Sequence, residues 1–305
     1  MAMEFEARGA QDARAAQAGT LPPVGTFGLG SADYPVLLSL IKDAPELLYY
    51  RGDLSVLSLP TVAVVGSRRA TEYGKWVAYN LGKRCAEHGV VVVSGMAEGI
   101  DSYAHQGALA GGGRTVAVFG TGIDICFPMN NGGLLRQILH DGLVLSEYPP
   151  GYPASKYTFP QRNRIISGLS YATVVVEAAI SSGSLITAER AAEQGREVYA
   201  VPGNINRKTS IGCNKLIADG ARPLVFLDDV IADLGIRLHA SGKKAVRLTG
   251  LERAVHDLVL ENGEIRPEEA ALLTRASESE IRSAVTLLEM KGLVHYAAGR
   301  ILITR

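Results

Sequence analysis

The stretch Thr61-Val-Ala-Val-Val-Gly-Ser-Arg-Arg-Ala-Thr-Glu-Tyr-Gly74 decides the fold of this sequence. Five apolar or β-branched residues lead directly into Gly66, Ser67 and two arginines, and a helical pattern then covers 73–87. A nearly continuous run of valine is typical of a parallel strand that helices cover on both faces. The stretch therefore predicts a strand, a loop and a helix of an α/β domain.

The same alternation of strand and helix continues toward the C-terminus. Further short apolar runs lie at 90–93, 115–119, 143–145, 173–176, 198–201 and 224–226. Helical patterns between them include 134–140, 185–194 and 215–219. This order predicts a doubly wound, mostly parallel sheet. Ahead of it, the short apolar stretches between 32 and 59 predict helical turns that cap the domain edge.

Four segments divide the chain. Residues 1–30 are polar and rich in Ala and Gly, which predicts a disordered leader. Residues 31–237 form the α/β domain, 238–249 a linker, and 250–305 a small C-terminal domain. In that last segment three helical patterns precede a short hairpin around Gly299, which predicts a winged helix. The three patterns cover 251–260, 267–274 and 278–291.

The composition limits the classes of function. The 305 residues carry 31 Lys and Arg against 31 Asp and Glu, so a surface that coats polyanions everywhere is excluded. Any nucleic-acid contact must be a local patch. The three cysteines lie far apart without metal-ligand spacing, which predicts reduced thiols and a cytoplasmic location. No signal peptide and no membrane-spanning run is expected, because no apolar stretch reaches about 18 residues.

Loops rich in Gly and Ser follow five of the predicted strands. In an open α/β sheet, ligands bind beyond the carboxyl ends of the strands. Backbone N–H groups in such loops suit phosphate oxygens, although a single glycine there commonly serves only a tight turn. Five loops along one edge predict an anion-binding groove. They begin at Gly66, Ser94, Gly120, Ser181 and Pro202.

Cations and one aromatic ring occur in and near these loops. Arg68 follows the first strand directly, and Lys156 lies in a loop rich in Pro and Tyr. Arg162 and Arg164 are predicted to lie at the opening of a helix. Most arginines and lysines merely face solvent, but Arg68 is fixed between glycines at the ligand edge. Phe159 either packs in the core or stacks on a base.

The sequence offers no convincing catalytic set. Motifs of P-loop hydrolases, dinucleotide-binding enzymes, zinc proteases and serine hydrolases are absent. Asp101 and Asp124 are predicted to cap helices, and His105 to be a structural histidine. We therefore expect a protein that is not an enzyme and that needs neither a metal nor a cofactor.

Several of these stretches resemble the DprA/Smf family of DNA-processing proteins. The resemblance covers roughly residues 33–235 and implies an extended Rossmann-like fold that binds single-stranded DNA. It also implies a homodimer that protects incoming strands in natural transformation and helps to load the recombinase RecA. The matching motifs are Gly66–Arg68 with Tyr73-Gly74, Ser94–Asp101, Gly120–Asp124, Phe159–Ser170, Ser182–Thr187, Gly195–Gly203 and Gly212–Ile217.

Carried onto this chain, the resemblance implies a phosphate contact for Arg68 and a basic side chain at Lys156, three residues before the Phe-Pro pair. Phe159 is implied to lie near a base. Together with the loops described above, the predicted single-stranded DNA site consists of Ser67, Arg68, Gly95, Lys156, Phe159, Arg162, Asn163, Arg164, Gly183 and Ser184.

The chain departs from the family pattern at three places. Residues 1–30 are too short for the N-terminal helical domain of many members, and Phe127 stands where a Tyr-Pro pair is common. The winged helix occurs in only some members. Its third helix carries three glutamates against Arg282 and Lys291, so we expect a protein contact, or one with the chain's own α/β domain, at least as readily as duplex DNA.

Two other functions stay open from the sequence. One is a nucleotide-processing enzyme related to the lysine-decarboxylase-like phosphoribohydrolases, which carry a PGGxGTxxE loop. The comparable residues here, 176–184, lack that loop, and Glu177 alone does not carry hydrolysis. The other is a pure protein-interaction scaffold, which would leave the row of anion-binding loops unexplained.

Overall fold

The chain forms two compact units, the first ending at His239 and the second beginning at Ala240. The computed structural model describes residues 21–235, 248, 250–291, 293–297 and 299–303. Of the predicted linker, only Leu248 falls among these residues, and residues 1–20 of the predicted leader lie outside them. The strand Gly25–Gly28 shows that the ordered domain begins earlier than residue 31, so the prediction of a leader over 1–30 is wrong for its last part.

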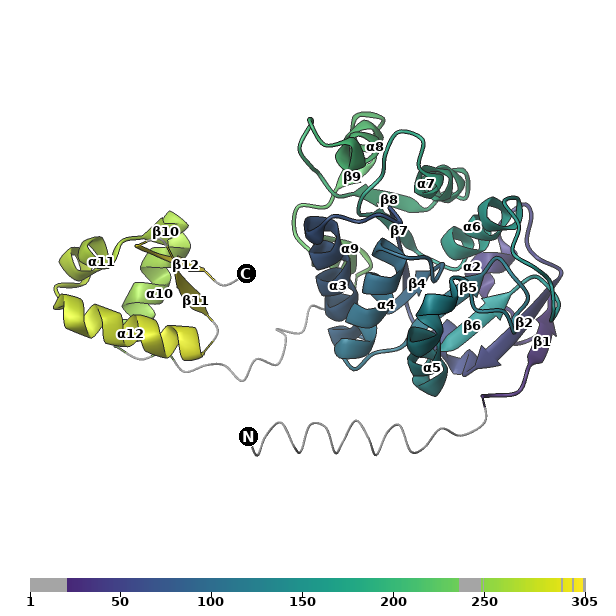
Figure 1. Cartoon of the computed structure of the whole chain (residues 1–305), viewed down its shortest axis with the longest axis horizontal. Coiled ribbons are helices and arrows are strands. Elements are labelled where there is room, and N and C mark those ends of the chain that lie inside the picture. The colour runs from purple at the N-terminus through teal and green to yellow at the C-terminus, as the bar shows by residue number, and fades with distance from the viewer. Residues whose placement is uncertain (1–20, 236–247, 249, 292, 298, 304–305) are drawn as a thin grey trace. The chain divides into compact units, whose positions relative to one another are not determined.

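A nine-stranded sheet organises the first unit, in the order β1-β2-β6-β5-β4-β3-β7-β8-β9 (Figure 1). All neighbouring strands from β6 to β9 run parallel, whereas β1 and β2 are antiparallel additions at one edge. The strands are β1 (Gly25–Gly28), β2 (Leu47–Gly52), β3 (Thr61–Val65), β4 (Val91–Ser94), β5 (Thr115–Phe119), β6 (Leu143–Ser146), β7 (Ala172–Val175), β8 (Glu197–Ala200) and β9 (Arg222–Pro223).

Helices cover both faces of the sheet, which confirms the predicted mostly parallel α/β fold. One layer contains α3 (Glu72–Glu87), α4 (Ile100–Ala110), α5 (Gly132–Asp141) and α9 (Asp229–Asp233). The other contains α2 (Val36–Ser39), α6 (Thr158–Gly168), α7 (Gly183–Glu193) and α8 (Lys208–Ala218). Short 3₁₀ helices lie at Leu54–Ser58 and Met129–Asn131.

The valine runs form strands because both of their faces find an apolar partner. Along β3, Val62 and Val64 pack with the layer of α3 and α4. Ala63 and Val65 pack with the layer of α6 and α7. Each side chain is almost completely buried, which contributes about 1.5–3 kcal/mol for a fully buried valine.

Winding reverses between β3 and β7. The chain leaves β3 through α3 toward β4, β5 and β6, and it returns through α6 to place β7 on the other side of β3. Such a switch point separates the loops of the two neighbouring strands and opens a crevice at their carboxyl ends. Here these loops begin at Gly66 and Val176.

Two parts of the edge differ from the sequence-based prediction. Leu47–Gly52 forms strand β2, not helical turns, and pairs antiparallel with β1 and β6. Residues 224–226 follow the last strand, which is only Arg222–Pro223. Neither segment has the pattern of a buried strand, because Leu47–Gly52 mixes polar and apolar residues and Arg222–Pro223 is a short, exposed edge strand.

The second unit contains α10 (Leu251–Asn262), α11 (Pro267–Thr274) and α12 (Glu278–Met290). A three-stranded antiparallel sheet accompanies them in the order β10 (Glu264–Ile265), β12 (Arg300–Ile303), β11 (Val294–Ala297). Ser277 and Glu280 form the capping box that opens α12, as the sequence predicts. The winged-helix assignment stays a prediction.

Candidate nucleic-acid interface

A groove of about 710 Å³ lies at the switch point of the first unit. Its walls come from the loop after β3, the loop before α6 and the start of α7, which are remote in sequence. The lining residues include Gly66, Arg68, Ala97, Asp101, Phe127, Ser155, Lys156, Phe159, Pro160, Arg162, Asn163, Ser182, Gly183, Ser184 and Thr187. Seven of the ten predicted site residues therefore meet in one groove.

An arginine and two aromatic rings form a layered cluster in this groove. The Arg68 guanidinium carbon lies 5.5 Å from the centre of the Phe159 ring. The Phe127 ring also contacts Phe159, with 5.3 Å between the two ring centres. A flat guanidinium and a ring in contact offer surfaces on which an unpaired base can stack. Phe127 was not predicted as a site residue, since its only signal in the sequence was its place beside Pro128.

Lys156 provides the second exposed cation of the groove. Its ammonium group lies 5.1 Å from the centre of the Tyr157 ring. Within the described part of the chain, neither Lys156 nor Arg68 takes part in an ion pair. Both charges are therefore available to an anion from solution.

The start of α7 turns backbone donors toward the groove. Ser182 caps this helix, and its hydroxyl accepts a hydrogen bond from the Ser184 amide at 3.4 Å. Gly183 is exposed, and Asn163 donates to its carbonyl at 3.3 Å. The first turn carries no acidic residue, so the helix terminus keeps its affinity for an anion. Ser182 was missed, although a serine before a glycine and an apolar run is a common capping signal.

Arg162 lies beneath the groove, and the prediction that it contacts DNA is corrected. The side chain is only 4% exposed. Its guanidinium donates to the carbonyl of Gly95 at 2.8 Å and to the carbonyl of Val118. These two hydrogen bonds join the ends of β4 and β5. Burial lowers the pKa of Arg162 to about 10, partly offset by the charge of Asp101. We assign Arg162 to the support of the groove floor.

The loop at Gly95 is closed by internal hydrogen bonds. Its amide donates to the Asp101 carboxylate at 3.1 Å, and Asp101 also accepts from the Ala97 amide at 3.4 Å. A Cβ atom at position 95 would lie 2.5 Å from the Arg162 guanidinium, which explains the glycine. Gly95 is therefore not a phosphate contact. Burial raises the pKa of Asp101.

The predicted helix caps also have other roles. Asp101 braces the loop before α4, whose cap is Gly99. Asp124 accepts a hydrogen bond from the Gly151 amide at 2.8 Å and so joins two loops. Both predictions of a helix cap are wrong, because the carboxylates reach backbone amides outside the first turn of a helix.

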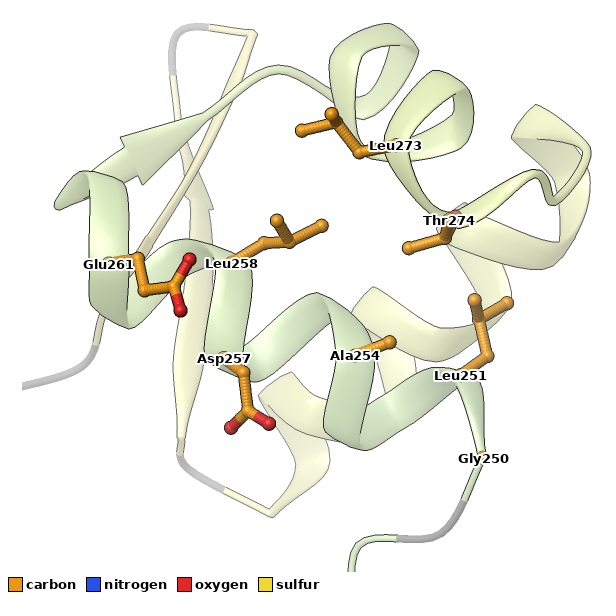
Figure 2. Close-up of a pocket in the computed structure, with 8 residues that line it drawn as sticks. All are labelled: Gly250, Leu251, Ala254, Asp257, Leu258, Glu261, Leu273 and Thr274. Carbon is orange, nitrogen blue, oxygen red and sulfur yellow. The ribbon is translucent and has the colours of Figure 1, made fainter.

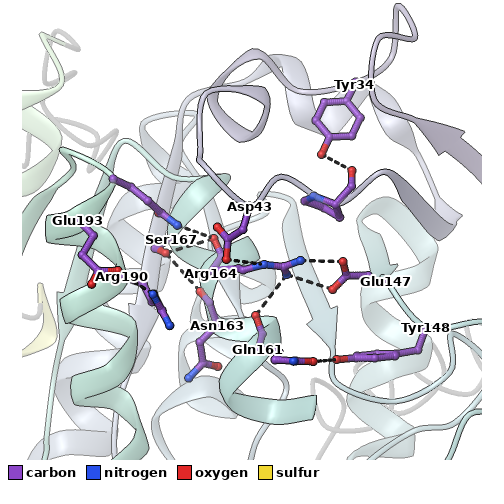
Figure 3. Close-up of polar contacts among 12 residues, drawn as sticks. Tyr34, Asp43, Glu147, Tyr148, Gln161, Asn163, Arg164, Ser167, Arg190 and Glu193 are labelled. Atoms are coloured by element: carbon purple, nitrogen blue, oxygen red, sulfur yellow. Dashed lines mark hydrogen bonds and ion pairs between the residues drawn. The ribbon is translucent and has the colours of Figure 1, made fainter. Parts of the chain in front are cut away.

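Arg164 belongs to an ion-pair network on the far side of α6 (Figure 3). Its guanidinium binds both oxygens of Glu147, at 2.7 and 3.0 Å, and contacts Asp43 at 3.0 Å. The side chain is 13% exposed. Because two carboxylates and the Gln161 carbonyl accept from this guanidinium, we assign Arg164 a structural role in place of the predicted DNA contact.

Ser67 and Glu177 hold the floor between β3 and β7. The Ser67 amide donates to the Glu177 carbonyl at 2.7 Å. This amide is therefore not available for the phosphate contact that the sequence predicted. The Glu177 carboxylate is 3% exposed and accepts from the amide and the hydroxyl of Thr71, where α3 begins. Glu177 thus caps a helix and does not line the groove.

His105 is a buried structural histidine. Its Nδ1 lies 2.7 Å from the Thr115 hydroxyl, which donates its own proton to the Val92 carbonyl. The Thr115 oxygen therefore accepts a hydrogen bond from the Nδ1–H of His105. Burial lowers the pKa of His105 to about 3.

A second pocket, in the C-terminal unit, has the opposite electrostatic character (Figure 2). It has a volume of about 450 Å³ between α10 and α11. Leu258 and Leu273 point into it, and its charged lining residues are Asp257 and Glu261. Two carboxylates repel phosphate groups, so we exclude this pocket as the nucleic-acid site.

Comparisons with known proteins show the family of this chain. The family model of DNA recombination-mediator protein A matches residues 26–235. DNA processing protein DprA of Streptococcus pneumoniae is 50% identical over 210 residues, which cover 68% of this chain and 73% of that protein. The Bacillus subtilis DNA processing protein DprA is 41% identical over 212 residues, covering 69% and 71%.

Solved structures give the same result. The crystal structure of the Streptococcus pneumoniae protein superposes with a TM-score of 0.66 at 46% identity, over 73% of this chain and 77% of that one. The Helicobacter pylori DNA processing protein A, described with a single-stranded DNA binding mode, gives 0.65 at 30% identity, over 72% and 98%. Among the described residues, helices are too short or too polar to span a bilayer.

Proposed function

The chain belongs to the DprA/Smf family of DNA-processing, recombination-mediator proteins, and we propose that the groove between β3 and β7 holds single-stranded DNA. The Arg68–Phe159–Phe127 cluster carries this proposal. A cation beside two rings suits a strand whose bases are unpaired, because each ring face can stack on a base of any identity. Lys156 and the exposed start of α7 supply the phosphate contacts.

Single strands are favoured over duplexes by the same chemistry. In a duplex, each base is stacked between its neighbours and its face is closed to a protein ring. A duplex therefore gains only the phosphate contacts of Arg68 and Lys156 and loses about 1–3 kcal/mol for each base that would have stacked. Most contacts would reach the backbone, so the preference for particular sequences is weak.

We assign binding without turnover. Glu177 supports this assignment, because its carboxylate is buried, bonded to Thr71 and turned away from the groove. His105 is neutral, and among the described residues its ring contacts Thr115. Asp101 lines the groove, but its carboxylate accepts hydrogen bonds from the amides of Gly95 and Ala97 and is held in the loop, so the enzymatic alternative lacks a positioned general base.

Delivery of the strand to RecA and action as a cytoplasmic homodimer are the finer parts of the proposal. Both come from the family resemblance. Val225 and Phe226, which are 64% and 70% exposed beside the edge strand β9, offer an apolar surface for a second copy. Light scattering of the Phe226→Glu variant tests this surface, since a dimer that used it would dissociate.

Fluorescence anisotropy of labelled oligo-dT tests the groove. We expect wild type to bind the single strand more tightly than a matching duplex, with a slope of log K against log salt of roughly −2 to −4 for three to five phosphate contacts. The Arg68→Glu/Lys156→Glu variant should lose this binding.

The matched control reverses two exposed cations outside the groove, Lys42→Glu/Arg136→Glu. It should bind within about threefold of wild type, because charges beyond a Debye length of roughly 10 Å are screened. Equal loss in both variants would mean that net charge and not the groove governs binding. A wild type that ignores single strands would reopen the enzymatic function.

A further inference from the structure

The loop after β8 carries a cationic surface that none of the predicted site residues includes. Residues Asn204 to Lys208 are all exposed; Arg207 ends the loop and Lys208 is the first residue of α8. Between Val198 and Ala218 the sequence contains no acidic residue. In the part of the chain that the structure describes, neither cation forms an ion pair.

Hydrogen bonds tie this loop to the groove floor. The Ser67 amide donates to the Glu177 carbonyl at 2.7 Å, and the Ala178 amide donates to the Thr209 carbonyl at 2.8 Å. Arg68 follows Ser67, and Lys208 precedes Thr209. Each of these hydrogen bonds joins backbones about 5 Å apart, so the backbones of the two cations are separated by about 10 Å.

Two side chains hold the start of this loop. The Asn214 side chain donates to the Gly203 carbonyl at 2.8 Å and accepts from the Gly203 amide at 3.1 Å. The Tyr73 hydroxyl, on the first turn of α3, donates to the Pro202 carbonyl at 3.4 Å. Half of the Tyr73 side chain is exposed, so an aromatic surface accompanies the two cations.

We propose that Arg207 and Lys208 extend the DNA path beyond the groove, across the carboxyl ends of β7 and β8. The proposal rests on the function proposed above. A separation of about 10 Å corresponds to about three stacked nucleotides at 3.4 Å each, and fewer in an extended strand. A strand that occupies the Arg68–Phe159 groove thus brings its next phosphates to Arg207 and Lys208.

Oligonucleotide length separates this extension from the groove itself. In the full chain, Arg207→Ala/Lys208→Ala is compared with wild type on a 3-mer and a 15-mer of dT. On the 15-mer, the loss of two phosphate contacts should reduce the salt slope by about 1.4 and weaken binding several-fold at low salt. On the 3-mer, whose two phosphates are adjacent and span less than the separation of about 10 Å, the change should stay below about twofold.

Two controls make the outcome specific. Arg207→Lys/Lys208→Arg keeps both charges and should bind the 15-mer like wild type. Lys42→Ala/Arg136→Ala removes the same charge elsewhere and should leave both salt slopes unchanged.

An unchanged salt slope on the 15-mer would overturn the proposal, and so would an equal loss on both lengths. Arg68→Ala distinguishes the two levels of inference. If it weakens both oligonucleotides while the Arg207 and Lys208 variant weakens neither, the groove function stands and the extension fails. If Arg68→Ala has no effect on either length, the groove function itself fails.

Discussion

Replacing Arg164 by methionine is expected to destabilise the α/β unit while single-stranded DNA binding persists. Methionine keeps much of the apolar stem of the side chain and removes the guanidinium. The change breaks the two bonds to Glu147 and the contact with Asp43, which together join α6 to the segment before β2 and to the end of β6. Arg164 is not among the residues that line the groove.

The magnitude follows from how well each partner is shielded from water. Removing one member of a buried ion pair costs about 3–5 kcal/mol. Glu147 is 26% exposed and Asp43 55% exposed, so water partly replaces the lost donors. We expect a loss of about 2–3 kcal/mol in the free energy of unfolding. For a unit of this size, that corresponds to a fall in Tm of about 4–12 °C.

Thermal melting and anisotropy on the 15-mer measure the two effects, with binding recorded at 20 °C where the variant remains folded. Arg190→Met is the matched control, because its partner Glu193 is an exposed neighbour on the same helix. Such a surface pair contributes about 0–1 kcal/mol. A variant Arg164→Met that melts like wild type and loses DNA affinity tenfold would refute the structural role of this arginine.

Three further outcomes are expected. Phe159→Leu should weaken single-stranded DNA by about 1–3 kcal/mol and leave duplex binding unchanged in anisotropy, and equal losses on both would contradict base stacking. Neutral His105, with its pKa near 3, should make wild type lose stability as pH falls below 6.5, since the unfolded chain then takes up a proton. His105→Leu should show a smaller drop in urea midpoint between pH 7 and pH 4.5, and an equal drop would refute the burial argument. The hydrogen bond from Arg84 lowers the pKa of Asp228, so Asp228→Asn should be less stable than wild type at pH values above the ordinary pKa of 3.8. The difference in Tm between the two proteins should vanish as pH falls through the lowered pKa. A difference that persisted in acid would contradict this ion pair.

The central strands were predictable because their sequence leaves little alternative. Thr61–Val65 and Thr115–Phe119 are buried on both faces, and the predicted and observed bounds coincide. Strand β2 reads Leu-Leu-Tyr-Tyr-Arg-Gly, which mixes polar and apolar residues in no clear period. Its conformation depends on pairing with β6, a contact distant in sequence.

The groove residues that follow strand ends or lie near helix starts were predictable, whereas the internal partners of Arg162 and Arg164 were not. Arg68, Lys156 and Phe159 meet because the carboxyl ends of β3 and β6 share one edge of the sheet. Arg162 and Arg164 fail because α6 begins at Thr158, five residues before the predicted start. Residues that are two positions apart in a helix point about 200° apart around its axis. Arg162 and Arg164 therefore cannot face the same side.

Their different partners depend on tertiary contacts. Arg162 meets carbonyls at the ends of β4 and β5, and Arg164 meets Glu147 and Asp43. No local pattern in the sequence specifies these contacts.

The switch point also sets when the groove comes into existence during synthesis. Arg68 emerges from the ribosome about 120 residues before Thr187, the last residue that lines the groove. At about 5–20 residues per second, the delay is roughly 6–24 seconds. Until then a nascent chain carries the arginine loop without its opposite wall. A product truncated before β7 therefore lacks the assembled groove, and the competence to capture a strand arrives only when both halves of the sheet have been made.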